Sequence, residues 1–385
     1  MRISRILQIS LPAKQSAFLW GPRKTGKTTY LKERFPRSLV YDFLDTRLFL
    51  EFSKRPFLLR EQLLEVERSK LENPVILDEV QKVPQILDEV QSLIVSKGIR
   101  FILCGSSARK LRRGQANLLG GRAWRYHMHP LVSPEVADCK LLKILNGGML
   151  PDHFLQEDPR KSLQAYVQDY LKEEVFEEGL TRNVPAFSRF FDAAAYSHGE
   201  LLNYSNIARD CGVDSKTVRE YFQILADTFL GYLIEPFKKK QSRQVIGKAP
   251  KFYFFDVGVA GTVTKRSVVE ERGSDFGKAF EHFILTEILA FRSYRGFDFG
   301  LNFWRTKSGL EVDFVLGDGE IAIEVKGSPL VDVRELKAMK VFREEVKVKQ
   351  ALMVCNEKSR RLSDGIRLLP WRIFLDKLWE GKIIH

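Results

Sequence analysis

Residues 21–28 read Gly-Pro-Arg-Lys-Thr-Gly-Lys-Thr, and this string, which fits the pattern G-x-x-x-x-G-K-S/T, constrains the fold more than any other feature. The apolar run 17–20 precedes it as a buried strand would, and residues 28–32 can continue as a helix. In that setting glycines let the backbone curl around an anion, and the helix N-terminus adds positive charge. The string therefore predicts a phosphate-binding loop; a chance glycine-rich turn is the alternative for the bare pattern.

Each residue type in this loop has an expected role. Lys27 would reach the β- and γ-phosphates of ATP, and the Thr28 hydroxyl would bind Mg²⁺. ATP and Mg²⁺ are thus the predicted cofactors. The residues expected to contact the nucleotide are Gly21, Pro22, Arg23, Lys24, Thr25, Gly26, Lys27, Thr28 and Thr29.

A second nucleotide element should be an apolar strand that ends in an acidic residue, and the string Ile-Leu-Asp-Glu-Val-Gln at 76–81 fits it. It follows Asn-Pro, so that 75–77 forms a short apolar run behind a breaker, which is typical of a buried parallel strand. We therefore expect Asp78 to hold the Mg²⁺ shell and Glu79 to polarise the water that attacks the γ-phosphorus.

The same six residues recur at 86–91. This second copy follows a proline, and its apolar residues keep a helical spacing up to a stop at Gly98. We predict a helix here and interpret Asp88 and Glu89 as solvated helix charges.

Two further positions have an expected part in nucleotide hydrolysis. The strand-like run 100–104 ends in Gly-Ser-Ser, and Ser106 or Ser107 could sense the γ-phosphate by a hydrogen bond; a simple turn is the alternative. Arg122 ends the string Leu-Leu-Gly-Gly-Arg before a predicted strand at 125–131 and could act as a finger on a neighbour's nucleotide, which implies a homo-oligomer. An ordinary surface arginine is the alternative, because further arginines crowd this stretch: Arg109, Arg112, Arg113 and Arg125.

A helix-turn-helix pattern lies further along the chain. Residues 204–210 read as a short helix, 211–213 as a tight turn, and Asp214 as the N-cap of the next helix. A strand pair at 232–237 and 252–255 would add a wing with a basic tip. The residues predicted to meet DNA phosphates and base edges are Lys216, Arg219 and Gln223 on the second helix and Lys238, Lys239 and Lys240 at the tip. Packing against protein, with solvated lysines, is the alternative.

The C-terminal region predicts a second chemistry. Residues 310–316 and 320–326 alternate apolar and polar types about Gly-Asp-Gly, which indicates a β-hairpin. A turn at Asp318-Gly319 places Asp313 opposite Glu324, and two facing carboxylates repel unless a cation lies between them.

A hard Mg²⁺ resolves this conflict. It would be ligated by Asp313, Glu324 and the carbonyl of Val325, and Glu281 on the preceding helix would complete the shell. Lys326 would orient an attacking hydroxide and stabilise the phosphate. The alternative is an exposed salt bridge between Glu311 and Lys326, worth under ~1 kcal/mol.

Length, net charge and cysteine content limit the classes of partner that the chain can have. The 385 residues suffice for two to four domains, and a formal net charge of +13 favours a polyanionic partner such as DNA. The four dispersed cysteines indicate a reduced, cytoplasmic protein. No apolar run approaches the ~18 residues of a membrane helix, so we expect no membrane partner.

Taken together, these strings resemble the prokaryotic AAA-type P-loop ATPases that carry a winged-helix domain and a C-terminal PD-(D/E)XK nuclease-like domain. Besides the four strings at 21–28, 77–81, 104–107 and 119–122, the matching pieces are Gly-Gly-Met-Leu-Pro at 147–151, Lys-Phe-Tyr-Phe-Phe-Asp at 251–256, Glu-Val-Asp-Phe at 311–314 and Ile-Glu-Val-Lys at 323–326. The resemblance implies an ATPase fused to a nuclease fold.

The expected fold class is α/β in four segments. They are a P-loop ATPase core with a parallel sheet at 1–134, a helical lid at 135–185, a winged helix-turn-helix at 186–268 and a restriction-endonuclease-like domain at 269–385. Two functions remain open. In the first, Mg²⁺-dependent ATP hydrolysis is coupled to DNA binding and metal-dependent DNA cleavage, with a second Mg²⁺ or Mn²⁺. In the second, ATP controls a binding switch that only grips nucleic acid or protein.

Overall fold

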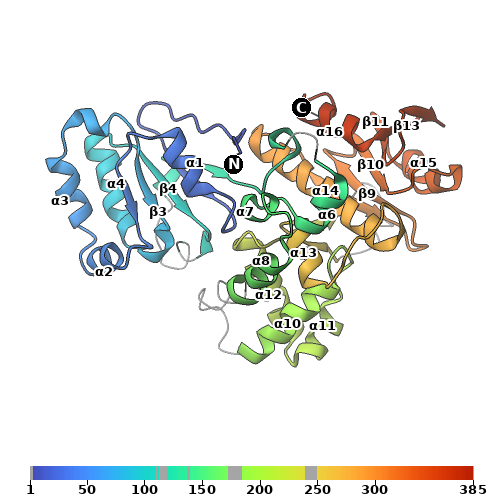
Figure 1. The fold of residues 1–385 in the computed structure, drawn as a ribbon, viewed down its shortest axis with the longest axis horizontal. Coiled ribbons are helices and arrows are strands. Elements are labelled where there is room, and N and C mark those ends of the chain that lie inside the picture. Colours follow the sequence, from blue (N-terminus) through green and yellow to red (C-terminus); the bar gives the residue numbers. More distant parts are fainter. Residues whose placement is uncertain are drawn as a thin grey trace. The chain divides into compact units, whose positions relative to one another are not determined.

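The structure is a computed structural model that describes residues 3–109, 111, 119–136, 139–171, 184–238 and 249–384. The chain forms two compact units. The N-terminal unit comprises Ser4–Pro130 and Asp227–Leu230, and the C-terminal unit comprises Met1–Ile3, Leu131–Ala226 and Gly231–His385. Each unit contains one β-sheet (Figure 1). The division of the chain into four segments stays a prediction.

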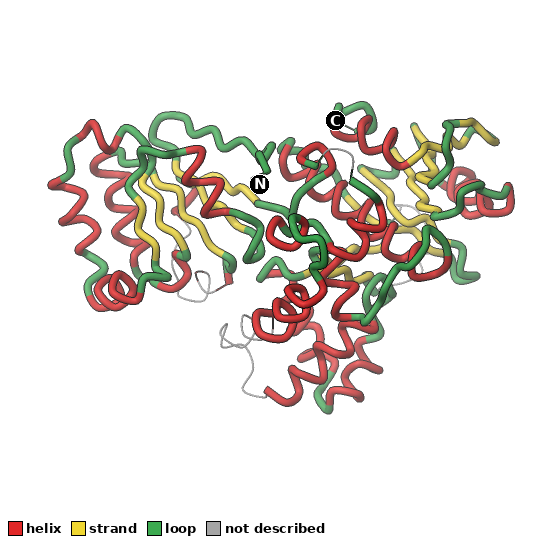
Figure 2. Tube along the Cα trace, viewed as in Figure 1, coloured by secondary structure: helices red, strands yellow, loops and turns green. Residues whose placement is uncertain are grey.

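The sheet of the N-terminal unit has five parallel strands in the order β2-β3-β4-β1-β5. Figure 2 draws strands in yellow between the red helices of this unit. Their bounds are β1 Ser16–Trp20, β2 Val40–Asp42, β3 Val75–Asp78, β4 Phe101–Gly105 and β5 Ala123–His127. Every residue of β1, β3 and β4 is buried, as expected for apolar strands covered on both faces. Because β4 lies between β1 and β3, the residues that follow these three strands meet at one edge of the sheet.

Helices flank this sheet, and their bounds are α1 Lys27–Arg34, α2 Thr46–Lys54, α3 Leu58–Glu65 and α4 Ile86–Lys97. The two copies of the duplicated string adopt different structures, as predicted: the first copy ends β3 with its residues 76–78 and continues into a 3-10 helix, Val80–Lys82, whereas the second copy begins α4. Leu87, Val90 and Leu93 of α4 join the core of the unit, and Gly98 ends the helix with a φ of 68°. Identical residues thus fold differently because their flanking residues differ.

The sheet of the C-terminal unit has eight strands in the order β12-β13-β11-β10-β9-β8-β6-β7. Their bounds are β6 Gly231–Pro236, β7 Lys251–Phe254, β8 Leu301–Arg305, β9 Glu311–Leu316, β10 Ile321–Lys326, β11 Gln350–Cys355, β12 Arg361–Ser363 and β13 Ile366–Pro370. The strands predicted as a separate wing, β6 and β7, join this sheet because β6 pairs in parallel with β8. The predicted boundary at 268/269 therefore runs through one continuous sheet.

Long helices cover both faces of this sheet. Helix α14, Gly273–Tyr294, and helix α16, Trp371–Trp379, pack on one face with Phe314 and Ile323. Helix α15, Lys337–Glu345, packs on the other face with Val315 and Ala322. Glu281, on α14, is thereby placed beside the strands that follow it in the sequence.

The described residues of this unit also form shorter helices. Their bounds are α6 Leu141–Gly147, α7 Pro151–Phe154, α8 Arg160–Ala165, a π-helix Tyr166–Leu171, α10 Val184–Tyr196, α11 Tyr204–Cys211, α12 Ser215–Asp227 and α13 Val257–Val263. The predicted helix pair is present as α11 and α12, joined through Gly212 with a φ of 67°. The Asp214 carboxylate accepts a hydrogen bond from the Thr217 amide at 2.7 Å. In the described part of the chain, no helix combines the length and apolarity needed to cross a bilayer.

Two strings of the family resemblance meet in a packing contact. The Asp256 carboxylate caps α13 by accepting from the amides of Gly258 and Val259, both at 2.9 Å. Its second oxygen accepts from the Met149 amide at 2.7 Å. A Cβ at Gly148 would lie 2.1 Å from Asp256 Oδ1, so only glycine fits there. The Gly-Gly-Met and Phe-Phe-Asp strings therefore stabilise the fold.

Candidate functional site

The string 21–28 forms the connection between β1 and α1, as predicted. Gly21 has a φ of 155°, and a Cβ there would lie 2.3 Å from the Met128 carbonyl oxygen. Gly26 adopts a φ of 88° as the N-cap of α1. Both glycines are required because the loop passes close to its neighbour and turns sharply into the helix.

Lys27 lies over this loop with its side chain buried. Its ammonium donates hydrogen bonds to the carbonyl oxygens of Gly21 at 2.7 Å and Pro22 at 2.9 Å. Thr25 is also internal to the loop and donates to the Pro22 carbonyl at 2.8 Å. Lys24 and Thr29 are exposed, and Arg23 is half-buried.

An additional arginine, which the sequence analysis did not identify, holds the loop from the outside. The Arg5 guanidinium donates to the Thr25 carbonyl at 2.6 Å and to the carbonyls of His129 at 2.7 Å and Pro130 at 3.1 Å. Nothing in the sequence signals this contact, because the residues that Arg5 joins are distant along the chain. Arg5 is thus a positioning residue for the loop.

The structure brings together Thr28 and Asp78, the two residues expected to hold Mg²⁺. The Thr28 hydroxyl donates to Asp78 Oδ2 at 2.6 Å, and Asp78 Oδ1 accepts from the Glu79 amide at 3.0 Å. Asp78 is only 2% exposed. The loop after β1 and the acidic end of β3 therefore form one site.

Glu79 and Ser106 are linked by a residue that the sequence analysis missed. The Gln81 side-chain amide donates to Glu79 Oε2 at 2.5 Å and to Ser106 Oγ at 3.1 Å. Glu79 itself has a positive φ of 54°, and a Cβ at Gly105 would lie 2.3 Å from Gln81 Oε1. The sequence signal for Gln81 is its place in the string 77–81, two residues after Glu79.

The two serines after β4 differ in role. Ser106 faces Gln81, whereas Ser107 Oγ accepts from the Arg109 amide at 3.2 Å. Arg109 forms an ion pair with Asp227 at 3.4 Å. The geometry therefore favours Ser106 of the two candidates.

Arg122 is exposed and directly precedes β5, which begins at Ala123 and not at Arg125. Strand β5 runs parallel to β1, with Ser16 beside Ala123 and Trp20 beside His127. The phosphate loop follows Trp20 at the carboxyl end of β1, whereas Arg122 lies at the amino end of the neighbouring strand. With a rise of about 3.3 Å per residue, the length of one strand separates them by roughly 15 Å. Arg122 cannot serve the nucleotide of its own chain.

Asp313 and Glu324 face each other in the C-terminal unit. The register of β9 and β10 pairs Leu316 with Ile321 and Phe314 with Ile323, and its continuation by one residue places Asp313 opposite Glu324. Both side chains are buried, at 7% and 4% exposure. Burial and, to a smaller extent, repulsion from Glu324 raise the pKa of Asp313 well above its ordinary value. Burial also raises the pKa of Glu324 to about 7.

Three contacts surround these two acids. The Val325 amide donates to Asp313 Oδ2 at 2.8 Å, and the Lys326 ammonium lies 2.7 Å from Glu324 Oε1. Among the described residues, Glu324 Oε2 is buried without a hydrogen-bond partner. Burial lowers the pKa of Lys326, but the neighbouring carboxylates of Glu324 and Asp313 outweigh it and raise that pKa.

A buried lysine on β7, absent from the sequence-based assignment, joins the two other acids. Lys251 is 4% exposed, forms a short ion pair with Glu311 and lies 3.6 Å from Glu281 Oε1. The Tyr253 hydroxyl donates to Glu281 Oε1 at 2.5 Å. We call Lys251, Tyr253, Glu281 and Glu311 the Lys251 cluster.

This arrangement corrects two expectations. Glu311 pairs with Lys251 and Arg305, while Lys326 pairs with Glu324, so the alternative salt bridge between Glu311 and Lys326 is wrong. Among the described residues, no three or more His, Cys, Asp or Glu side chains are arranged to hold a metal ion. Glu281 therefore does not complete a three-carboxylate shell here, because Lys251 and Tyr253 engage its carboxylate.

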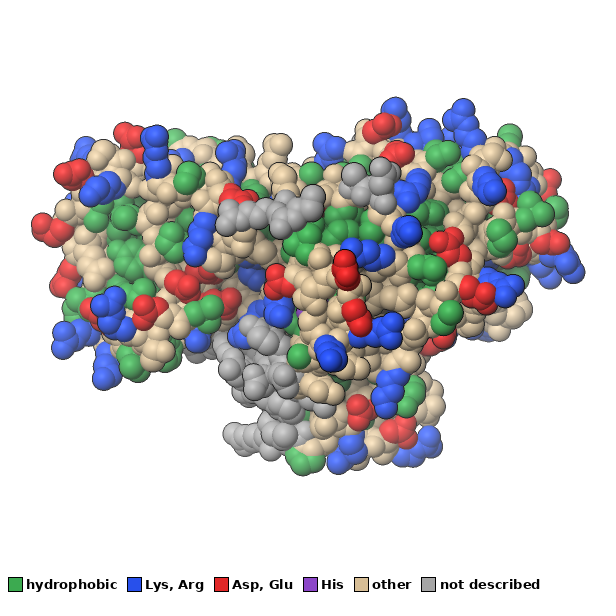
Figure 3. Space-filling view, in the orientation of Figure 1, with side chains coloured by type: hydrophobic (Ala, Val, Ile, Leu, Met, Phe, Trp, Pro, Cys, Tyr) green, Lys and Arg blue, Asp and Glu red, His purple; other side chains and the backbone are tan. Residues whose placement is uncertain are grey.

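The predicted DNA-facing residues of α12 point outward. Lys216, Arg219 and Gln223 are exposed, and the Arg219 guanidinium lies 4.9 Å from the centre of the Tyr204 ring. Lys238 is exposed, whereas Lys239 and Lys240 lie outside the described residues. On the face seen in Figure 3, basic side chains are interspersed with acidic ones.

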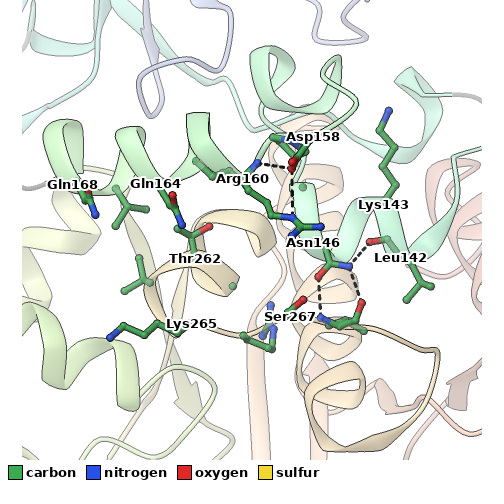
Figure 4. Close-up of a pocket in the computed structure, with 18 of the residues that line it drawn as sticks. Leu142, Lys143, Asn146, Asp158, Arg160, Gln164, Gln168, Thr262, Lys265 and Ser267 are labelled. Atoms are coloured by element: carbon green, nitrogen blue, oxygen red, sulfur yellow. Dashed lines mark hydrogen bonds and ion pairs between the residues drawn. The ribbon is translucent and has the colours of Figure 1, made fainter.

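A separate cavity of about 1040 Å³ lies among α6, α8, α10 and α13 (Figure 4). The Asn146 amide bridges to the backbone of Val268 at 2.9 Å, and the Arg160 guanidinium lies 3.4 Å from Asp158. Basic and acidic side chains both line it: Lys143, Arg160, Lys265 and Arg266, and Glu157, Asp158 and Asp192. This mixed lining does not select a ligand of either charge.

Three family models match consecutive parts of the chain. Residues 13–137 match an AAA domain. Residues 140–270 and 276–374 match two models described as domains of unknown function, DUF8612 and DUF4143. The residues that line the cavity all lie within the first of these two matches, and Glu281, Glu311, Asp313 and Glu324 lie within the second.

Among solved structures, the Aeropyrum pernix ORC1 protein in complex with DNA is similar at 13% identity, over 65% of this chain and 86% of that chain. Its TM-score of 0.25 is too low to support an argument. No curated protein matches the chain. The phosphate loop and the Thr28–Asp78 contact both lie within residues 13–137, the part of the chain that matches the AAA domain.

Proposed function

We propose that the N-terminal unit binds and hydrolyses ATP with Mg²⁺, and that this turnover is coupled to DNA binding and metal-dependent DNA cleavage by the C-terminal unit. One observation carries the nucleotide half of this proposal: the 2.6 Å hydrogen bond from Thr28 to Asp78. It joins the end of the phosphate loop to the acidic strand, the two elements that hold Mg²⁺ in P-loop ATPases.

Binding would begin at the phosphate loop. Lys27 would exchange its hydrogen bonds to the Gly21 and Pro22 carbonyls for phosphate oxygens, and the loop amides would cradle the same anion. Thr28 and Asp78 would hold Mg²⁺, and the bound ion would supply positive charge that stabilises the phosphate during the transfer.

Hydrolysis would depend on Glu79. Its carboxylate would orient and deprotonate the attacking water, and Gln81 would set its position. Because Gln81 also contacts Ser106, the serine that would sense the γ-phosphate is connected to the base through one side chain. Arg122 would act on the nucleotide of a second copy of the chain, since it lies at the far edge of its own sheet.

The C-terminal unit would hold a divalent cation between Asp313 and Glu324. The fit rests on the donors: two buried carboxylates suit a hard cation, and Glu324 Oε2 is without a partner among the described residues. Bound Mg²⁺ or Mn²⁺ would supply an activated water and charge stabilisation. Lys326 would orient the hydroxide and stabilise the phosphate, because its charge is fixed beside Glu324.

DNA is the proposed substrate and partner. The net charge of +13 and the exposed side chains of Lys216, Arg219 and Gln223 support it. The second candidate is an ATP-controlled binding switch without cleavage. It is favoured by one observation: no three-carboxylate group is arranged for a metal among the described residues, since Lys251 engages Glu281.

Plasmid cleavage in Mn²⁺ tests the nuclease assignment. Wild type should cut, and Lys326→Ala should not. We call Asp313, Glu324, Lys326 and the Lys251 cluster together the acidic site. Lys349→Ala is the matched control, because that lysine also pairs with a glutamate, Glu320, but is largely exposed and lies outside the acidic site. Cutting by all three proteins would contradict the role of Lys326. Cutting by none of them, with ATP-dependent DNA binding retained, would favour the switch.

A further inference from the structure

Lys251 lies in a position that is unusual for a lysine. It is 4% exposed on β7, and its ammonium is enclosed by Glu311, by Glu281 Oε1 at 3.6 Å and by the Phe303 ring, whose centre is 5.5 Å away. A buried ammonium is stable only when carboxylates surround it, and removing one partner of such a group is costly. Lys251 is therefore an integral charge of the acidic site.

The charges of the site divide into two halves. In the first half, Lys251 contacts Glu281 and Glu311, with Arg305 on the second oxygen of Glu311 at 2.8 Å. The Tyr253 hydroxyl fixes Glu281 in this position. These two carboxylates are thus already neutralised by groups of the protein itself.

The second half is not neutralised in the same way. Asp313 and Glu324 lie next to each other on β9 and β10. Among the described residues, the ion pair in this half is that of Lys326 with Glu324 at 2.7 Å, whereas Lys251 acts on Asp313 only from beyond ion-pair distance. Glu324 Oε2 is buried without a partner among those residues. A cation would therefore bind at this half in preference to the Lys251 cluster.

We propose that the Lys251 ammonium permanently takes the place of a second divalent cation, so that the acidic site binds a single Mg²⁺ or Mn²⁺ between Asp313 and Glu324. This inference rests on the proposed metal site. Lys251 and Lys326 then have separate tasks: the buried Lys251 fixes Glu281 and Glu311, whereas Lys326, with a side chain 33% exposed, is the lysine that reaches a substrate.

Mn²⁺ binding to the full chain tests the inference without any activity assay. The EPR signal of free Mn²⁺ measures how many ions each chain binds. All proteins carry Asp78→Asn and no nucleotide is added, so that the N-terminal unit contributes no ion. Wild type in this background should bind one Mn²⁺ per chain, and Asp313→Asn none. Lys251→Met should bind two, because the charges of Glu281 and Glu311 are released. Lys251→Met with Glu281→Gln should return to one.

If Lys251→Met is unstable, its thermal unfolding with and without Mn²⁺ tests the inference instead. Mn²⁺ should then raise its unfolding temperature more than that of wild type, because the ion replaces the missing ammonium, while Lys251→Arg should behave as wild type. A folded Lys251→Met that binds one Mn²⁺, an unstable one that Mn²⁺ does not rescue, or a wild type that binds two would each overturn the inference. A wild type that binds none would instead refute the metal site of the proposed function.

Discussion

The two candidate sites are assembled in different ways. In the N-terminal unit, Lys27 and Thr28 belong to one string, and Asp78, Glu79 and Gln81 belong to another. In the C-terminal unit, the acidic site collects side chains from β7, β9, β10 and α14. The first site is therefore encoded by short strings, whereas the second depends on which strands become neighbours.

This difference affects how each site tolerates change. The P-loop site is held by backbone geometry at glycines and by a few short hydrogen bonds, so single substitutions should remove its chemistry and leave the fold. The acidic site is held by buried ion pairs, so substitutions there change charge balance and stability together.

The largest expected effect concerns Lys27. Lys27→Ala should reduce ATP hydrolysis to background, because it removes the ammonium that faces the phosphates. Lys32→Ala, an exposed lysine on the same helix α1, is the control and should keep wild-type turnover. Steady-state phosphate release measures the turnover of both variants. Unchanged turnover in Lys27→Ala would contradict the assignment of residues 21–28 as the nucleotide-binding loop.

A smaller effect is expected at Gln81. Gln81→Ala should slow ATP hydrolysis about tenfold with little change in ATP affinity, the loss expected for one hydrogen bond to a catalytic carboxylate. The duplicated string provides the control, because Gln91 holds the same position in the second copy and lies on α4. Equal rates in Gln81→Ala and wild type would show that the contact to Glu79 has no part in turnover.

The affinity for duplex DNA and its salt dependence test the predicted DNA contacts of the C-terminal unit. Lys216→Ala should weaken duplex binding equally for all sequences and reduce the log–log salt slope by about one unit, because one phosphate contact is lost. Lys161→Ala, an exposed lysine on α8, should leave the slope unchanged. No binding by wild type near 50 mM salt would point to a protein-packing role for α11 and α12.

A pH dependence of stability is expected in the C-terminal unit. Glu287 is 1% exposed and accepts hydrogen bonds from Ser133 and from the Trp379 indole; burial raises its pKa to about 7. A raised carboxyl pKa contributes stability that is present below the unfolded pKa of 4.5 and is lost as pH rises through about 7.

Between these two pH values, the free energy of unfolding of wild type relative to Glu287→Gln should therefore fall by about 1 kcal/mol per pH unit. Denaturant titrations at several pH values measure it. A difference between the two proteins that is constant with pH would contradict the raised pKa.

The P-loop unit could largely be predicted from the sequence. The flanks of the two identical strings separate strand from helix, and Asp78 meets Thr28 because parallel strands end at one edge of the sheet. The facing of Asp313 and Glu324 was also predictable, since a turn at Asp318-Gly319 and the period of two residues fix the register.

Other contacts were beyond sequence reasoning. Lys251 reaches Glu281 and Glu311 because β6 pairs in parallel with β8, a tertiary choice that no local pattern specifies. Arg5 contacts the phosphate loop through a backbone carbonyl. Every residue has this group, so the sequence does not indicate the contact. Gln81 was present in a recognised string, but its contact with Ser106 depends on the close approach of Gly105.

The most direct test of the account compares ATP hydrolysis by Glu79→Gln and Glu89→Gln, two substitutions in identical strings with different structures. Glu79→Gln should bind ATP but hydrolyse it ~10²-fold or more slowly, as expected when a general base is lost. Glu89→Gln should match wild type, because Glu89 lies on α4 and pairs with Arg60 at 3.6 Å. Equal defects in the two variants, or a larger defect in Glu89→Gln, would contradict the assignment of the catalytic site to the end of β3.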